Sequence, residues 1–83
     1  MIRSQQIRAA RVLLDISQAK LAEMASIGIA TIKRVEAARG KVTGNAETIW
    51  KIERALEAAG VIFLPEDENG GVGVRLKKEF RAD

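Results

Sequence analysis

Residues 17–36, which read SQAKLAEMASIGIATIKRVE, decide how this chain folds. They hold two short segments whose apolar residues recur at helical spacing, and only three or four residues separate the segments. Ser17 is a favourable N-cap for the first helix, over 18–25. One face of that helix is apolar: Leu21, Ala22 and Ala25. Because Ala22 is small, the next helix can approach closely, so the stretch predicts two packed helices joined by a tight bend.

The second segment begins near Gly28, which is an acceptable N-cap. At about 100° per residue, four residues share its inner side: Thr31, Ile32, Val35 and Ala38. The other side carries small, aliphatic or positively charged residues: Ile29, Ala30, Lys33, Arg34 and Ala37. This pattern predicts a helix that buries one side in a core and presents a cationic side to solvent.

Two further helices flank this pair. Residues 4–14 predict the earlier one, with Ser4 as its cap. Its apolar face comprises Ile7, Ala10 and Leu14. Asn45 is a good cap for the later helix, which should run through Ala59 and end at Gly60. The core stripe of this last helix comprises Ile49, Ile52, Leu56 and Ala59.

After the fourth helix the sequence changes character. Residues 61–64 are β-branched and aromatic, and Pro65 and an acidic run over 66–68 follow them. Over residues 72–77, apolar side chains alternate with glycine or basic residues at a period of two. The dipeptide Asn69-Gly70 lies between the two segments and favours a hairpin turn. We therefore predict a C-terminal β-hairpin.

A lone two-stranded hairpin is at best marginally stable in water. We expect its apolar face to pack on the helix that begins after Asn45, and its free edge to pair with a second copy of the chain. Trp50 lies off the centre of that helix's core stripe, and we interpret it as a core or dimer-filling residue rather than a ligand platform. The predicted dimer interface comprises Trp50, Val61, Ile62, Phe63, Leu64, Val72, Val74 and Leu76. Residues from Lys78 on are expected to fray.

The distribution of charge separates the helical region from the hairpin. The net charge of the 83-residue chain is +3. Residues 1–60 carry ten Lys and Arg against six Asp and Glu, and residues 61–83 carry four against five. The positive excess therefore lies with the helices, as expected for a domain that meets a polyanion, although a merely solvated surface gives the same count.

Composition excludes several classes of function. The chain has no cysteine and no histidine, which removes disulfides, zinc fingers and nearly all nucleophile–base pairs of those residues. No apolar run approaches the roughly 20 residues that span a bilayer. Gly70-Gly71-Val72-Gly73 lacks the following helix or lysine of a phosphate-binding loop. We expect no catalysis, cofactor, metal or membrane contact, and a cytoplasmic location.

Aligned without gaps from Arg11 to Glu36, the chain resembles the lambda-repressor-like, Cro/C1-type (XRE) helix-turn-helix family. The matching residues are Arg11, Leu14, Ile16-Ser17-Gln18, Leu21-Ala22, Ala25, Ile27, Ala30-Thr31-Ile32 and Val35-Glu36. The fourth predicted helix also resembles that of the family, so the likeness covers roughly residues 5–60. It implies a mainly α fold, with a four-helix DNA-binding domain over 1–60 and the hairpin as an extension over 61–83.

The resemblance also implies roles for individual residues. Base edges of double-stranded DNA would be contacted by Gly28, Ile29, Ala30, Lys33 and Arg34. Phosphates would be contacted by Ser17, Gln18, Arg39 and Lys41. Arg11 and Glu36 would form an ion pair that ties the first helix to the third. Ile29 is at the edge of the outer arc and could instead complete the core, while Lys33 and Arg34 could be idle surface charges.

The chain departs from the family pattern in three places. Ser26 stands where the family usually has glycine, which costs about 1 kcal/mol if that residue needs a positive φ. The segment after Glu36 is about two residues longer than the commonest spacing, so Arg39 and Lys41 lie where the chain departs from the family pattern. The hairpin replaces the usual fifth helix, so the family's mode of dimerisation cannot be carried over.

The expected function is that of a transcriptional regulator, a repressor by preference, which reads an inverted repeat as a homodimer. Pairing two small modules doubles their base contacts and supplies specificity. The alternative is an antitoxin-like protein-interaction module on the same scaffold. In that case the acidic loop and the strands would form the edge that docks a protein partner.

Overall fold

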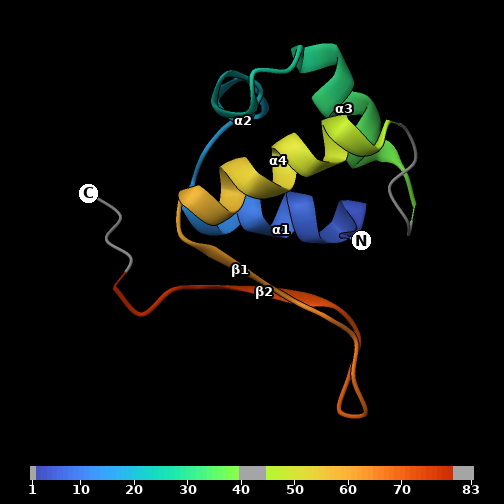
Figure 1. The fold of residues 1–83 in the computed structure, drawn as a ribbon, viewed down its shortest axis with the longest axis vertical. Coiled ribbons are helices and arrows are strands. Elements are labelled where there is room, and N and C mark those ends of the chain that lie inside the picture. Colours follow the sequence, from blue (N-terminus) through green and yellow to red (C-terminus); the bar gives the residue numbers. More distant parts are fainter. Residues whose placement is uncertain (1, 40–44, 80–83) are drawn as a thin grey trace.

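The computed structural model describes residues 2–39 and 45–79. Within that part, the elements in chain order are α1 (Ser4–Leu14), α2 (Gln18–Ala25), α3 (Ile29–Ala37), α4 (Ala46–Ala58), β1 (Val61–Leu64) and β2 (Gly73–Leu76). The helices form one body, and the hairpin lies along its lower side in Figure 1. The predicted fold class, four helices followed by a C-terminal hairpin, is confirmed.

The core lies where the four helices meet. The predicted residues that are buried are Ile7, Ala10, Leu21, Ala22, Ala25, Ile32, Val35, Ile49, Ile52 and Leu56. Ile2 and Val61 join them, which the helical patterns did not predict. Four predicted stripe residues are only half-buried: Leu14, Thr31, Ala38 and Ala59. Ala38 and Ala59 are C-cap residues and lie beyond the last turns of their helices.

The caps differ from prediction at one helix. Ser17 Oγ accepts from the Lys20 amide at 2.9 Å, and Asn45 Oδ1 accepts from the amide two residues later at 2.7 Å, as N-caps should. Ser4 is not the cap of α1, because Arg3 occupies that position in an extended conformation. Ser4 is instead buried as the first helical residue, and its hydroxyl donates to the carbonyl of Ala38.

Two residues that are not glycine adopt the left-handed conformation at helix ends. Asp15 after α1 and Ser26 after α2 both have φ 57°. Ser26 therefore occupies the backbone region in which glycine is favoured, and the strain costs about 1 kcal/mol. Gly60, which ends α4 as predicted, has φ 113°.

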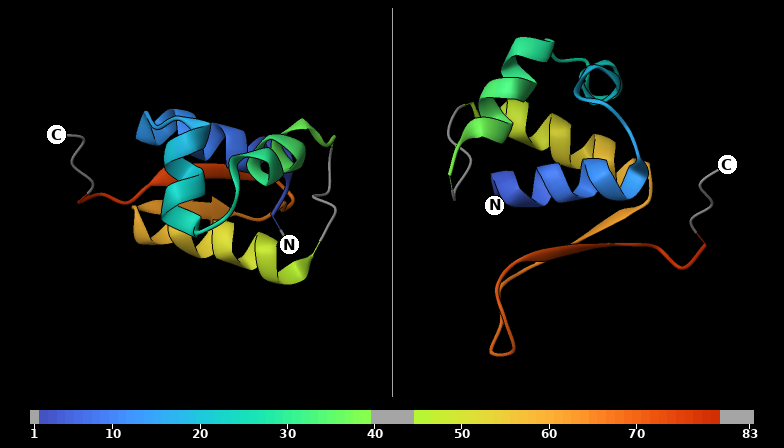
Figure 2. Two further views of the ribbon diagram at one scale, coloured as in Figure 1. Left: turned by 90° about the horizontal axis from the view of Figure 1, so that it is seen from above. Right: turned by 180° about the vertical axis from the view of Figure 1, so that it is seen from behind.

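The hairpin is antiparallel, with Val61 opposite Leu76 and Leu64 opposite Gly73. Val72 lies just before β2 rather than within it. Asp67 closes the turn, because its Oδ1 accepts hydrogen bonds from the amides of Asn69 and Gly70. The expected packing on α4 is confirmed for β1, and the hairpin also reaches a second helix, because β2 contacts α1, as the view from above shows (Figure 2).

Gln6 explains why the hairpin reaches α1. Its side chain is 4% exposed, and its Nε2 donates to the carbonyls of Leu64 and Gly73 at 3.2 and 2.9 Å. Its Oε1 accepts from the Arg3 amide at 2.8 Å. One buried amide thus pins both strands beneath α1 and also closes the start of that helix.

The interpretation of Trp50 as a core residue is wrong. Its side chain is 57% exposed, and the Arg54 guanidinium lies over its ring at 5.4 Å from the centroid. Trp50 follows Ile49, which occupies the buried face of α4, so the indole is turned about 100° away from the core. Its predicted place in a dimer interface stays a prediction. The expected fraying from Lys78 on falls mostly on residues 80–83, outside the described residues.

Candidate nucleic-acid interface

The outward side of α3 is an exposed surface of small, aliphatic and cationic residues. We call it the outer face of α3, and it comprises Gly28, Ile29, Ala30, Lys33 and Arg34. Ile29 is 41% exposed, so it does not complete the core. The inward residues Ile32 and Val35 are buried against the other helices. All five predicted base-contacting residues are thus exposed, four of them on α3 and Gly28 at its N-cap.

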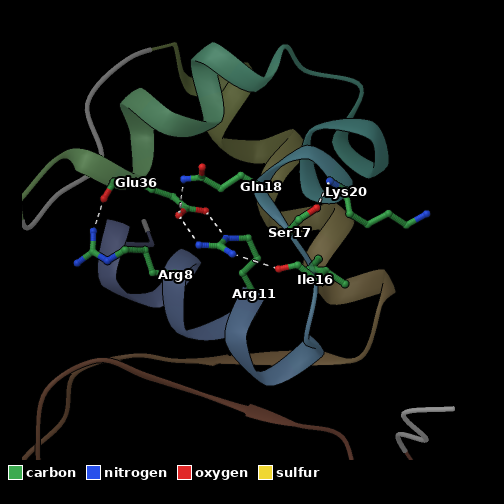
Figure 3. A network of polar contacts seen from close by, with 7 residues as sticks. All are labelled: Arg8, Arg11, Ile16, Ser17, Gln18, Lys20 and Glu36. Atoms are coloured by element: carbon green, nitrogen blue, oxygen red, sulfur yellow. Dashed lines mark hydrogen bonds and ion pairs between the residues drawn. The ribbon is translucent and has the colours of Figure 1, made fainter.

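An ion pair between the half-buried Arg11 and the buried Glu36 fixes α3 to α1. Arg11 Nε lies 2.8 Å from Glu36 Oε2, and Arg11 Nη2 donates to Glu36 Oε1 at 3.0 Å (Figure 3). The contact is bidentate, which holds both side chains in one geometry. The third nitrogen, Nη1, donates to the carbonyl of Ile16 at 3.1 Å. The ion pair predicted between Arg11 and Glu36 is present, and it also ties down the segment between α1 and α2.

The electrostatics of the pair keep Arg11 charged. Hydrogen bonding to Glu36 raises the pKa of Arg11 above its ordinary value, and the opposite charge of that carboxylate adds to the effect. Burial acts in the other direction and is outweighed. Since Glu36 is only 3% exposed, its charge depends on this cation for compensation.

Two more side chains complete the network around Glu36. Gln18, the first residue of α2, donates from Nε2 to Glu36 Oε1 at 3.1 Å. The guanidinium of Arg8 donates to the backbone carbonyl of Glu36 (Figure 3). Sequence reasoning missed Arg8, although its spacing of three residues from Arg11 places both on one side of α1. One residue of α3 thereby joins all three N-terminal helices.

Of the four predicted phosphate-contacting residues, three lie among the described residues and one does not. Ser17 and Gln18 lie together at the start of α2 (Figure 3), where Ser17 is exposed and Gln18 is half-buried. Arg39 is exposed two residues after α3 ends. Lys41 lies outside the described residues. The N-terminus of α2 and the outer face of α3 are therefore the described parts of the candidate interface.

Across 2–39 and 45–79, no cluster of three or more acidic side chains is arranged to hold a metal ion. In the same ranges, no helix has the length and apolar character needed to cross a membrane.

Comparison with known families agrees with the geometry. A family model described as helix-turn-helix matches residues 7–59, from α1 to the end of α4. The chain belongs to the Cro/C1-type helix-turn-helix family. Members of this family are DNA-binding regulators, and this protein is therefore a DNA-binding regulator of the Cro/C1 type. In this helix-turn-helix protein the matched region ends before β1, so the hairpin lies outside it. No curated protein matches the chain.

Proposed function

We propose that this protein is a transcriptional repressor that reads the major groove of an inverted-repeat operator as a homodimer. The observation that carries the proposal is the outer face of α3, which is cationic, exposed and held in place from behind by the Arg11–Glu36 ion pair. A helix presented in this way fits the major groove of B-DNA. A regulator of this kind works in the cytoplasm, where it meets the duplex.

The residues of the outer face suit base recognition. Lys33 or Arg34 donates to guanine O6 and N7, and the fork of Arg34 can do so with two hydrogen bonds. Ile29 and Ala30 offer methyl groups to thymine methyls. Gly28 has no side chain and no heavy atom near the position of a Cβ, so the groove wall can approach the backbone there.

Phosphate contacts at the start of α2 would set the position of α3 in the groove. Gln18 Nε2 donates one hydrogen to Glu36, which leaves its second hydrogen for a phosphate oxygen. Ser17 is exposed beside it, and the exposed Arg39 would reach the backbone from the other end of α3. Lys41, outside the described residues, stays a proposed phosphate contact. Such contacts supply most of the affinity and little of the sequence preference.

The proposal is tested by selecting bound duplexes from a random pool with the full chain. We expect an enriched sequence with two-fold symmetry, and a duplex affinity that falls steeply between low and moderate salt. Recovery of unenriched sequences, or an affinity that is indifferent to salt, would refute DNA reading. An enriched site without symmetry would refute the homodimer alone.

A second candidate function is docking of a protein partner, in the manner of an antitoxin. The exposed Trp50, stacked under Arg54, favours it, because Trp and Arg are enriched among residues that carry binding energy in protein interfaces. The same salt titration separates the two functions, since a protein-docking module needs no steep, duplex-dependent response.

A further inference from the structure

The hairpin has one edge whose backbone groups are suited to pair with another strand. The amide of Lys77 donates to the carbonyl of Gly60 at 2.9 Å, so these residues form a hydrogen-bonded pair of the ladder. Hydrogen-bonded and non-hydrogen-bonded pairs alternate along an antiparallel ladder. With the observed register, the N–H and C=O of Val74 and Leu76 therefore point away from β1. Val72 continues the same series just before the strand.

The opposite edge, on β1, is interrupted. Its outward groups belong to Val61 and Phe63 by the same alternation. The next outward position is Pro65, which has no N–H to donate. The β1 edge thus offers a shorter run of hydrogen-bonding groups than the β2 edge.

We propose that two copies of the chain pair antiparallel along β2, around a two-fold axis at Val74. In this register Val74 faces Val74 of the second copy, and Leu76 faces Val72. The axis one residue later would place Arg75 directly opposite Arg75, and like charges in that arrangement are destabilising. With the axis one residue earlier, at Gly73, Leu76 would lie opposite Gly70 of the second copy. The backbone of Gly70 is already hydrogen-bonded to Asp67 in the turn. The register at Val74 avoids both the pairing of like charges and the use of Gly70. In this register Arg75 lies opposite Gly73 of the second copy.

Charge complementarity supports the same register. Antiparallel pairing brings the end of β2 in one copy beside the turn of the other. The exposed Lys77 and Lys78 directly follow β2, and the turn region carries an exposed acidic run over 66–68. Two such clusters of opposite charge form in each dimer. In the dimer, the basic residues after β2 of each copy therefore lie beside the acidic turn of the other copy.

The exposed side of α1 fits this arrangement. Gln6 bonds to Gly73, and α1 and β2 run in the same direction (Figure 1). Ala9 lies three residues after Gln6, which is about 4.5 Å along the axis of α1. A strand covers about 3.3 Å per residue, so Ala9 is level with Val74, the residue after Gly73. The axis therefore sets the two α1 helices beside each other at the small, exposed Ala9, and it covers Leu13, which is 40% exposed.

Single cysteines in the full chain test the pairing directly, because the sequence has no other cysteine. Residues directly opposite each other lie about 5.5 Å apart between Cα atoms, within the range that a disulfide spans. We expect Val74→Cys to form a disulfide-linked dimer under mild oxidation with oxidised glutathione. Arg75→Cys should link slowly, and Ile62→Cys, on β1, should stay unlinked. Fast linking of Arg75→Cys, equal linking of all three, or none at Val74 overturns the register.

Charge reversal gives an independent readout of the same contact. Lys77→Glu with Lys78→Glu should weaken the dimer about tenfold at low salt in sedimentation equilibrium. Adding Glu68→Lys to that variant should restore part of the affinity, and Glu66 is left unchanged because it pairs with Arg3 of its own chain at 3.7 Å. Lys20→Glu with Lys51→Glu makes the same change of charge at exposed sites on α2 and α4 and should leave the dimer unchanged. An unaltered dimer in the first variant, no rescue in the second, or equal weakening in the control overturns the pairing.

The pairing rests on the homodimer in the proposed function, but the two fail separately. A chain that is monomeric in these assays and still enriches a duplex sequence contradicts the β2 pairing and leaves DNA reading intact. A β2-linked dimer that enriches no sequence contradicts DNA reading and leaves the pairing intact.

Discussion

Glu36 is the residue on which the orientation of α3 depends most. Its carboxylate accepts hydrogen bonds from Arg11 and Gln18, and its backbone carbonyl accepts from Arg8. These partners come from α1 and α2, so one buried side chain fixes the angle at which the outer face of α3 is presented.

Glu36→Ala should destabilise the protein by about 3 kcal/mol, because it leaves a partly buried guanidinium without its counter-charge. Chemical denaturation of the full chain measures the loss. Glu23→Ala is the matched control on α2, since Glu23 pairs with Lys20 at an exposed site. Equal midpoints for Glu36→Ala and the parent would show that the network contributes nothing to stability.

The pair should also resist alkaline pH. Hydrogen bonding to Glu36 raises the pKa of Arg11 above its ordinary value, so its stabilising contribution is complete below that ordinary value and is lost only as pH rises through the higher folded pKa. Arg11→Lys brings in a group with an ordinary pKa of about 10.4. We expect the stability difference between the parent and Arg11→Lys to widen above about pH 10 in thermal melts. A difference that stays constant through that range would contradict this assignment.

Ser26 carries backbone strain that a single substitution relieves. Ser26→Gly should stabilise the protein by about 0.5–1 kcal/mol, because glycine adopts φ 57° without the clash of a Cβ. Ala19→Gly, at an exposed position within α2, should have the opposite sign and cost about 1 kcal/mol. Thermal melts of both variants measure the contrast. Two changes of the same sign would mean that Ser26 is not strained.

At the scale of the elements, the sequence predicted the features that depend on local residue patterns. Periodicity located all four helices and the hairpin, and Ser17, Asn45 and Gly60 marked ends that the structure retains. Ser4 shows the limit, because its role is decided by Ala38, 34 residues away, rather than by its neighbours.

The same limit applies to the candidate interface. The outer face of α3 followed from helical periodicity, and Arg11 and Glu36 followed from the family likeness. Gln6 and Arg8 were missed because each donates to a backbone carbonyl of a distant element. Every residue has such a carbonyl, so the residue types do not show which one is bonded.

Gln6 supplies a test of how the hairpin is held. Gln6→Leu removes the donor to both strands and should destabilise the protein by about 1–3 kcal/mol, since buried polar partners are left unmatched. Hydrogen exchange should show faster opening of hairpin amides than of core amides in α4. Gln5→Leu makes the same change at the exposed neighbouring position. If the two variants exchanged alike, Gln6 would not be the anchor.

At the scale of the whole molecule, α3 and the hairpin occupy opposite sides of the helical body (Figure 1). This separation allows the two surfaces to act independently, one toward DNA and the other toward a second copy. Substitutions on the outer face of α3 should therefore leave the pairing of two copies through the hairpin in place.

The most direct measurement of the central claim is the binding of a selected duplex, against a scrambled duplex of equal length, by variants that lose the same charge from different faces. Lys33→Ala with Arg34→Ala removes two cations from the outer face of α3, and Lys51→Ala with Arg54→Ala removes two from α4. The account predicts that the α3 variant loses its preference for the selected duplex, while the α4 variant keeps it. Equal loss of preference in both variants, or a preference retained by the α3 variant, would contradict recognition of DNA by α3.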